Sequence, residues 1–431
     1  MTPPAQSPDH SKNEKRAYQN TKSSVAVTGM GCISAAGTDT KSHWININKS
    51  IACCRPVPDW LFPTKLSYPV FAAPHEALSP TGRDLFESAS PSLLSSTLSR
   101  TVRLAISAMA EALNQARIGL QYLRGEKVGI ALGTTVGCTF NNEDYYKQWR
   151  SGMRPDLAPI FHYLSGNLAQ ALHGILGTQG PSAVVTNACA SGTDAIGLAK
   201  GWIANGACDL AVAGGADELS RIAYNGFAGL QLSDTEQCRP FDRNRKGLNL
   251  GEGAGLLVLE KESQALERGI TPLGWVRGYG SASDAWHPTA PHPEGRGLKC
   301  AFAHALADAA LSTQDVAMIN AHGTGTMSND LAEANALSDL LPVPRHIAIV
   351  STKGMTGHTL GAAGGLEAVL TLLALLQGVT PGTHGCLSSD PQLPVSPVPQ
   401  GISVPLLTRI GISQSLAFGG GNAAIVMEAM P

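Results

Sequence analysis

Several features that mark specialised classes of protein are scarce in this chain of 431 residues. Charged residues account for 15% of the sequence and aromatic residues for 5%, and the formal net charge is −2. This balance gives the chain no general attraction to nucleic acid or to an anionic membrane. The longest apolar run, AVLTLLALL at 368–376, is far too short to cross a bilayer. We therefore predict no nucleic-acid partner and no membrane span.

The usual motifs of metal and nucleotide binding are also absent. Nine cysteines occur without CxxC or CxxxH spacing, so no metal site is expected. Neither a phosphate-binding GxxxxGKS/T loop nor a GxGxxG helix start after the first strand is present, so no nucleotide cofactor is expected. The odd cysteine count, with no apolar leader, favours reduced thiols. We predict a cytoplasmic protein that needs neither metal nor cofactor.

What the chain does contain is a long alternation of apolar strands and helices. Residues 1–22 are polar and are predicted to form a flexible tail. Apolar runs follow at 25–31, 128–134 and 209–217, and a helical pattern of apolar residues occupies 101–116. Because the runs do not alternate with polar residues, we expect an α/β fold whose sheets are covered by helices on both faces.

The apolar segments fall into two blocks of similar content. The first block opens with the strand at 25–31 and the second with a strand at 274–280, and each opening strand ends in glycine. Similar numbers of strands and helices follow in each block. We interpret the blocks as two halves of a duplicated architecture, residues 23–268 and 269–431.

Cys189 is the first residue of chemical interest, in the stretch TNACASGT at 186–193. It stands where an apolar strand is predicted to turn into a helix. Unpaired N–H groups at a helix start stabilise a thiolate, and small neighbours leave room for a tight turn. The alternative is a buried structural thiol, the commoner situation for a cysteine. The local pattern leaves both interpretations open.

A second polar stretch, NAHGTGT at 320–326, also follows an apolar strand. Loops after parallel strands are common ligand sites. His322 can donate a hydrogen bond to an oxyanion there, and the hydroxyls of Thr324 and Thr326 can bind a polar ligand. A histidine that merely satisfies backbone groups of the turn is the alternative.

A third stretch, STKGMTGHTLGAAGG at 351–365, places Lys353 and His358 after the apolar run at 347–350. A lysine in such a place needs a carboxylate partner unless it lies at the surface. Glu333, on the helix predicted after the His322 loop, is our candidate for that partner.

The turn AFGGGN at 417–422 separates two apolar strands. Its backbone N–H groups can contribute half of an oxyanion hole, although an ordinary hairpin turn explains the glycines equally well. What is harder to attribute to core packing is the joint occurrence of Cys189, His322, Lys353 and His358 at the ends of successive strands.

These residues resemble the condensing enzymes of the thiolase superfamily, specifically the elongating β-ketoacyl-(acyl carrier protein) synthases. The similarity extends over nearly the whole chain after residue 23 and is strongest at 186–197, 238–260, 320–337 and 351–369. The resemblance implies a thiolase-like five-layered αβαβα fold built from two similar halves. It also implies decarboxylative condensation of an enzyme-bound acyl group with a malonyl group.

Matched position by position, the resemblance assigns a role to each candidate residue. Cys189 corresponds to the acyl-accepting nucleophile, and His322 and His358 to the two histidines of the decarboxylating site. Lys353 corresponds to the family lysine and Glu333 to its acidic neighbour. Further matches are Phe418, the aromatic gate whose N–H joins that of Cys189 in the oxyanion hole; Thr324 and Thr326, which contact the carrier arm; and Val136 and Phe227, candidates for the wall of the acyl pocket.

The resemblance further implies an acyl carrier protein whose phosphopantetheine arm delivers the acyl and malonyl groups. It implies a dimer, expected to be a homodimer, with a heterodimer as the alternative. A second interpretation is a non-catalytic, chain-length-factor-like partner subunit of a heterodimeric ketosynthase, and the intact Cys189 argues against it. Met327, Ala417 and Gly421 depart from the usual family pattern, which favours specialised polyketide, polyene or lipid assembly over primary fatty acid synthesis.

Overall fold

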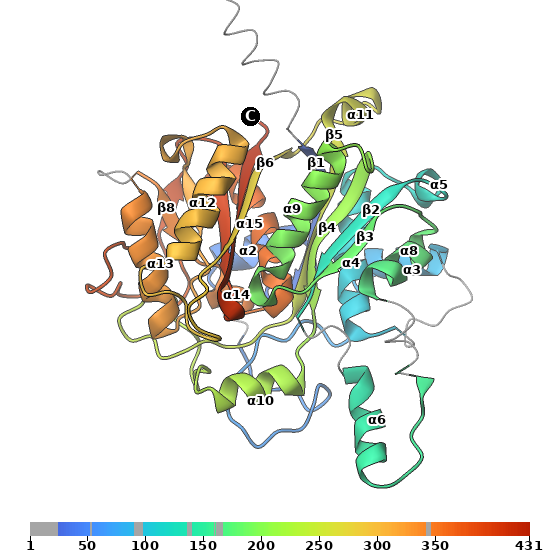
Figure 1. Cartoon of the computed structure of the whole chain (residues 1–431), viewed down its shortest axis with the longest axis horizontal. Coiled ribbons are helices and arrows are strands. Elements are labelled where there is room, and N and C mark those ends of the chain that lie inside the picture. The colour runs from blue at the N-terminus through green and yellow to red at the C-terminus, as the bar shows by residue number, and fades with distance from the viewer. Residues whose placement is uncertain are drawn as a thin grey trace, which may run out of the picture.

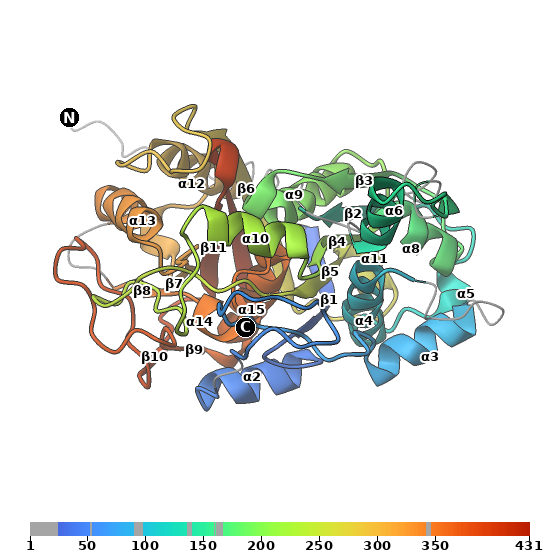
Figure 2. The ribbon, with the colours of Figure 1, turned by 90° about the horizontal axis from the view of Figure 1, so that it is seen from below.

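The structure is a computed structural model and describes residues 25–51, 54–89, 98–135, 140–158, 160, 167–341 and 346–431. The predicted tail at 1–22 and Val136, a candidate for the acyl pocket, lie outside these residues. Figures 1 and 2 show the arrangement of the helices and strands in two views.

One mixed sheet of ten strands runs through the molecule in the order β3-β2-β4-β5-β1-β6-β12-β11-β7-β8. In its middle, β1 and β6 pair antiparallel over only three residues of β1, Val25 to Val27. That short pairing joins two sheets of five strands each. The strands are β1 (Val25–Ser34), β2 (Val128–Gly133), β3 (Ser182–Val185), β4 (Leu210–Asp217), β5 (Gly253–Lys261), β6 (Gly274–Ser283), β7 (Met318–Asn320), β8 (Ala348–Val350), β11 (Ile410–Leu416) and β12 (Gly421–Ala429).

The two sheets share one topology. In the first, β3 runs parallel to β2 and β2 to β4, whereas β5 is antiparallel to both β4 and β1. In the second, β8 runs parallel to β7 and β7 to β11, whereas β12 is antiparallel to both β11 and β6. Strand for strand in chain order, both sheets therefore follow the sequence third, second, fourth, fifth, first. The division of the chain into two halves between residues 268 and 269 stays a prediction.

Helices cover both sheets and separate them, which produces five layers. α4 (Arg100–Gln115) packs on the outer face of the first sheet, and α12 (Arg296–Ala309) on the outer face of the second. Between the sheets lie α9 (Ser191–Ala204) and α15 (Ala363–Gln377), which contact strands of both. In Figure 1 these layers succeed one another across the picture, with α12 and α13 (Met327–Leu340) on one side and α4 on the other. The predicted αβαβα architecture is confirmed.

The central helix α15 is strongly apolar. The segment Leu360–Gln377 has the length and hydropathy of a membrane span, with 18 residues and a mean hydropathy of 1.6, but 89% of it is buried inside the protein. Its side chains belong to the core cluster between the two sheets, together with those of α9. The apolar composition therefore reflects a position between two sheets.

Glycines let α9 and α15 approach closely at the ends that carry the candidate site. A Cβ atom on Gly192 would lie 2.6 Å from the backbone nitrogen of Gly365 and 2.9 Å from the carbonyl oxygen of Gly361. A Cβ atom on Gly364 would lie 2.1 Å from the Thr193 hydroxyl oxygen. The backbones of the two helices are in direct contact here, which side chains larger than hydrogen would prevent.

Most strands and helices lie where the sequence predicts them, with two informative differences. The strand expected over 183–188 ends at Val185, because the chain turns sharply at Ala188, whose φ is 43°. The segment 379–405, predicted to be a surface connection, contains the strands β9 (Val379–Pro381) and β10 (Ser403–Pro405) and buries Cys386 completely.

Substitution at the α9–α15 contact should separate an effect of packing from an effect of helix propensity. We expect Gly192→Ala to lower the free energy of unfolding by about 1–3 kcal/mol, because the added methyl group meets backbone atoms that cannot move independently. Gly201→Ala, on the same helix with no atom within 4 Å of the added Cβ, is the control and should stabilise by up to about 1 kcal/mol. Denaturant unfolding of both variants tests this. Equal stability of the two would contradict the close contact.

Candidate active site

Cys189 sits on a strained turn between β3 and α9. The 3-10 turn Ala188–Ala190 leads directly into α9, and Ala188 has a positive φ of 43°. Ser191 fastens this turn, because its hydroxyl accepts a hydrogen bond from the backbone N–H of Asn187 (2.8 Å) and donates one to the carbonyl of Ala188 (2.6 Å). Strain of this kind in a non-glycine residue is typical of a functional turn. It presents the sulfur at the end of the helix.

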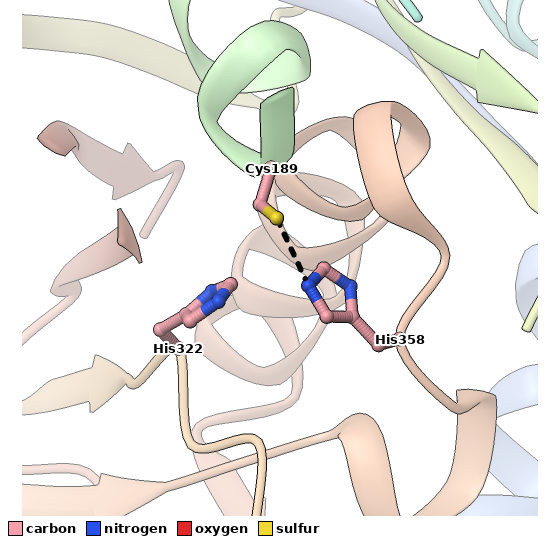
Figure 3. Close-up of side chains that lie close together, drawn as sticks. All are labelled: Cys189, His322 and His358. Atoms are coloured by element: carbon pink, nitrogen blue, oxygen red, sulfur yellow. Dashed lines mark hydrogen bonds between the residues drawn. The ribbon is translucent and has the colours of Figure 1, made fainter. Parts of the chain in front are cut away.

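Two imidazole rings converge on this sulfur from the second half of the chain. The Nε2 atom of His358 lies 3.1 Å from the Cys189 sulfur. The ring of His322 stands almost perpendicular to that of His358, with 5.1 Å between the ring centroids. Figure 3 shows the three side chains facing one another from separate elements. All three are buried, with at most 4% of any of them exposed. The structure thus brings together the cysteine and both predicted histidines.

Hydrogen bonds on the far side of each ring set its tautomer. The ammonium of Lys353 lies 3.2 Å from His322 Nδ1, and an ammonium can only donate. The backbone N–H of Leu360 donates to His358 Nδ1 at 3.2 Å. Because Nδ1 is the acceptor in both rings, Nε2 carries the hydrogen in both neutral histidines. Each ring therefore directs an N–H donor toward the space beside the sulfur.

Both histidines are neutral at physiological pH. Burial lowers the pKa of His322 well below 6.5, and the positive charge of Lys353 and the neighbouring His358 lower it further. Burial and then Lys353 also hold the pKa of His358 well below that value. Neutral imidazoles can stabilise a developing oxyanion by donation without adding a second cation to a buried site.

The resting state of the Cys189 sulfur differs from the expectation drawn from the sequence. Burial raises the pKa of the thiol to about 11, although the charge of Lys353 and the backbone N–H groups of Phe418 and Cys189 act to lower it. The helix start does supply N–H donors, as expected, but desolvation outweighs them. The protein consequently holds a protonated thiol near neutral pH. The neighbouring donors and the Lys353 charge reduce the cost of forming the thiolate but do not remove it.

The carboxylate that pairs with Lys353 is not the expected one. The Lys353 ammonium forms a short ion pair with Glu367 on α15, and both side chains are at most 2% exposed. Glu333, our candidate, instead accepts hydrogen bonds from the backbone N–H groups of His322 (2.6 Å) and Gly323 (2.7 Å). Glu333 thus holds the histidine loop to α13. The sequence signal that could have identified Glu367 is its place as the lone acidic residue of the otherwise apolar helix after Lys353.

The predicted oxyanion turn lies directly opposite Cys189. β11 ends in the short 3-10 turn Phe418–Gly420, in which Gly419 and Gly420 have φ values of 81° and 80°. The Phe418 N–H is one of the two backbone donors that act on the Cys189 sulfur. The turn is held from outside, because Gly419 N–H donates to the carbonyl of Pro288 (2.7 Å). It is therefore both a connection between antiparallel strands and a donor to the site.

A pocket opens above these groups and contains most of the remaining candidates. The Phe227 ring, on α10 (Arg221–Gly229), stacks on Phe418 with 5.3 Å between centroids and meets the edge of His358 at 6.4 Å. The hydroxyls of Thr324 and Thr326 lie 2.9 Å apart. The pocket is lined by Cys189, Phe227, Leu232, Leu248, Thr289, Pro291, His322, Thr324, Thr326, Ser328, Asn329, His358, Leu416, Ala417 and Phe418.

The three central side chains also have the composition of a metal site. One potential ligand atom from each of Cys189, His322 and His358 lies within 4.8 Å of the others. A Cys-His-His set with an open position is a known zinc arrangement. Here, however, each histidine would need to give up the Nε2 proton that its Nδ1 hydrogen bond imposes. The donor set fits the binding of an anionic oxygen better than the binding of a cation.

Comparison with known families gives matches over most of the chain. Residues 22–265 match the N-terminal domain of beta-ketoacyl synthase, and residues 273–386 match its C-terminal domain. A 3-oxoacyl-[acyl-carrier-protein] synthase 2 from Synechocystis is 33% identical over 424 residues, which cover 94% of this chain and 98% of the relative. A protein of the same name from Staphylococcus aureus is 32% identical over 413 residues, with 94% and 98% coverage.

Solved structures resemble the chain equally well. The ishigamide ketosynthase/chain length factor superposes with a TM-score of 0.86 at 30% identity and covers 95% of this chain and 99% of its own. A ketosynthase in complex with its chain length factor from Xenorhabdus doucetiae gives a TM-score of 0.78 at 29% identity, with 95% and 98% coverage. A beta-ketoacyl synthase from Burkholderia phymatum gives 0.83 at 28%, with 95% and 100% coverage.

The buried pair of Lys353 and Glu367 makes a stability prediction. We expect Lys353→Met to cost about 3–5 kcal/mol of unfolding free energy, because it leaves the Glu367 carboxylate buried without its partner. The double variant Lys353→Met, Glu367→Gln should recover much of that loss while it still lacks the charge beside His322. Denaturant unfolding of both variants measures the difference. A double variant no more stable than the single one would contradict the pairing.

Proposed function

Since this chain belongs to the beta-ketoacyl synthase family, we propose that it is a condensing acyltransferase, a 3-oxoacyl-(acyl carrier protein) synthase. It joins an acyl group held on Cys189 to the two-carbon unit of a malonyl thioester, with loss of CO2. The observation that supports this proposal is the convergence of one buried sulfur and two N–H-donating imidazoles beside an N–H-rich turn. No other feature of the described residues combines a nucleophile with so many donors.

Acyl transfer is the first half of the proposed reaction. The Cys189 sulfur attacks the carbonyl carbon of an acyl thioester, and the new oxyanion accepts hydrogen bonds from the N–H groups of Cys189 and Phe418. One such donor is typically worth about 3–4 kcal/mol in the transition state. When the carbon–sulfur bond to the carrier breaks, the proton lost by Cys189 ends on the departing carrier thiol. The step consumes no net proton, which suits a nucleophile that rests as a thiol.

Condensation is the second half. The thioester carbonyl of a malonyl group accepts hydrogen bonds from the Nε2–H groups of His322 and His358, which stabilise the enolate as the bond to CO2 breaks. The enolate carbon then attacks the acyl carbonyl carbon on Cys189, so that a carbon–carbon bond forms and the carbon–sulfur bond breaks. The Cys189 sulfur leaves as a thiolate and takes up one proton from solvent to return to the resting thiol. Lys353 keeps His322 in the donor tautomer, and Glu367 balances the charge of Lys353.

The substrates are proposed to arrive on an acyl carrier protein. The hydroxyls of Thr324 and Thr326 line the pocket beside Cys189 and are suited to the amide groups of a phosphopantetheine arm. The rings of Phe227 and Phe418 stack in the wall of the same pocket. Movement of the Phe418 ring would therefore open space for the acyl chain. The departures at Met327, Ala417 and Gly421 favour a specialised polyketide, polyene or lipid pathway. We place the reaction in the cytoplasm.

A partner subunit of the chain-length-factor type is the competing proposal. Two of the similar structures are described as a ketosynthase with its chain length factor, so a chain with this fold occurs in such two-subunit complexes. An inactive partner does not need a cysteine on a strained turn with two donor histidines. The intact site of this chain therefore favours the catalytic subunit.

We further propose that the protein is a homodimer, in which the second subunit is another copy of this chain. β3 is the last strand of the sheet and has an unpaired edge among the described residues. On the same side of the molecule α6 (Phe140–Arg150) projects from the body of the protein (Figure 1). Two aromatic side chains three residues apart on this helix are exposed, Tyr146 (57%) and Trp149 (56%), and exposed apolar groups of this kind are suited to contact with a second subunit.

Substitutions at the three central residues test the chemistry. Cys189→Ala should abolish the mass increase seen when the protein is incubated with acyl carrier protein. Cys189→Gln should still decarboxylate malonyl carrier, and the rate should persist as the pH falls through 6.5, because the pKa values of both histidines lie well below it. His322→Ala should lose decarboxylation and keep acylation. Acylation of Cys189→Ala would overturn the assignment of the nucleophile.

The proposed dimer is tested by the mass of the native protein in sedimentation equilibrium. We expect twice the chain mass for the wild type and dissociation for Trp149→Glu, because the charge would enter an apolar contact. Leu407→Glu is the control, since Leu407 is equally apolar and 76% exposed on another part of the surface. A wild-type protein that is monomeric would contradict the homodimer. If the protein dimerises only when a different ketosynthase-like chain is added, the heterodimer is the correct assembly.

A further inference from the structure

Gly421 and Asn187 form an unusual contact between the two turns that build the site. Gly421 directly follows the Phe418–Gly420 turn, and Asn187 directly precedes the turn that carries Cys189. A Cβ atom on Gly421 would lie 2.5 Å from Oδ1, 2.9 Å from Nδ2 and 3.0 Å from Cγ of Asn187. The carboxamide of Asn187 thus occupies the space that a side chain at position 421 would need.

The backbone at Gly421 does not itself require glycine. Its φ of −68° and ψ of 133° are extended values that any L-residue adopts. Gly419 and Gly420, by contrast, have positive φ values that favour glycine. The absence of a side chain at position 421 is therefore explained by the Asn187 carboxamide, which occupies that space. The two residues form a complementary pair.

Asn187 is held on its other side by a buried acid. Its Nδ2 donates a hydrogen bond of 2.7 Å to Asp194, on the first turns of α9, and Asp194 also accepts from the Tyr279 hydroxyl at 2.8 Å. Asp194 is 8% exposed, so these two donors, together with a hydrogen bond from the Ser281 side chain, satisfy a carboxylate that lies out of water. The Asn187 side chain consequently cannot turn away from Gly421 without leaving Asp194 short of a donor.

We propose that Asn187 is a positioning residue, which sets the spacing between the nucleophile turn and the oxyanion turn by wedging its carboxamide between Asp194 and Gly421. The two backbone donors that act on the sulfur, the N–H groups of Cys189 and Phe418, stand one on each turn. A change in the spacing of the turns moves one donor relative to the other. Misplacement of a reacting group by about 1 Å can cost about a hundredfold in rate.

The inference rests on the proposed acyl transfer to Cys189, and its test is a double-mutant cycle. The single-turnover rate of acylation by an acyl carrier protein is measured for Gly421→Ala, Asn187→Ala and the double variant. We expect Gly421→Ala to fall by about a hundredfold, because the methyl group pushes the turns apart, and Asn187→Ala by about tenfold. The double variant should be faster than Gly421→Ala alone, because the vacated space accepts the methyl group.

Matched controls distinguish positioning from general damage. Gly174→Ala adds a methyl group to an exposed helix position with no atom within 4 Å, and Asn48→Ala removes an exposed asparagine that donates to one backbone carbonyl. Both should acylate at the wild-type rate. In the cycle the KM for the carrier should stay unchanged while the maximal rate changes, since neither Asn187 nor Gly421 lines the pocket. Thermal unfolding identifies any variant that has lost its fold.

A second variant supplies a readout that a structural role alone would not move. Asn187→Asp puts a second carboxylate within hydrogen-bond distance of Asp194. At low pH the two acids share a proton and keep the wedge, whereas at high pH both ionise and repel each other. Its acylation rate, relative to wild type, should therefore fall as the pH rises.

The same double-mutant cycle is then measured with the alkylation of Cys189 by iodoacetamide. This reaction needs no carrier and does not depend on the proposed function. Coupling in acylation and in alkylation supports the inference. If no carrier acylates the wild-type protein but the alkylation rates still show coupling, Asn187 remains a positioning residue and the proposed acyltransferase activity is overturned. Independent effects of the two substitutions in both assays, or a Gly421→Ala rate equal to that of Gly174→Ala, would overturn the role of Asn187.

Discussion

The direct backbone contact between α9 and α15 is the constraint on which the rest of the site depends. No side chain separates the two backbones, because the residues in contact are Gly192 of α9, Gly365 of α15 and Gly361 just before α15. Cys189 precedes the first helix by two residues, and His358 lies shortly before the second. The approach of the two helices therefore sets the separation of sulfur and imidazole, which no local feature of either turn could do alone.

A single buried cation organises the polar groups around that contact. The Lys353 ammonium stands beside His322 and pairs with Glu367, and its charge lowers the pKa of both histidines and of Cys189. One charge thus adds to the effect of burial in keeping two bases neutral, and it partly offsets the cost of an anion on sulfur. Glu367 keeps the net charge of the cluster low enough to be buried.

The fold and the main site residues could be predicted because their signals are local. The strands are continuous apolar runs. Cys189 follows one of them, His322 follows a second, and Lys353 and His358 both follow a third. The partner of Lys353 was mispredicted because the sequence offers two glutamates, Glu333 and Glu367, on helices near the site, and only the packing decides which one reaches the ammonium. The pKa of Cys189 was missed because burial depends on the whole fold. The pair of Asn187 and Gly421 joins residues far apart in the chain, and each looks ordinary in its own segment.

The repeated strand order of the two sheets has a consequence for the history of the site. β3 and β8 are the third strands of their halves, so the turn that carries Cys189 and the segment that carries His358 occupy equivalent places. A symmetric ancestor assembled from two identical halves would have presented the same residue twice across its axis. In this chain the two corresponding segments carry different residues, Cys189 four residues after the end of β3 and His358 eight residues after the end of β8. That difference gives one half a nucleophile and the other a hydrogen-bond donor, which a reaction of two unlike substrates needs.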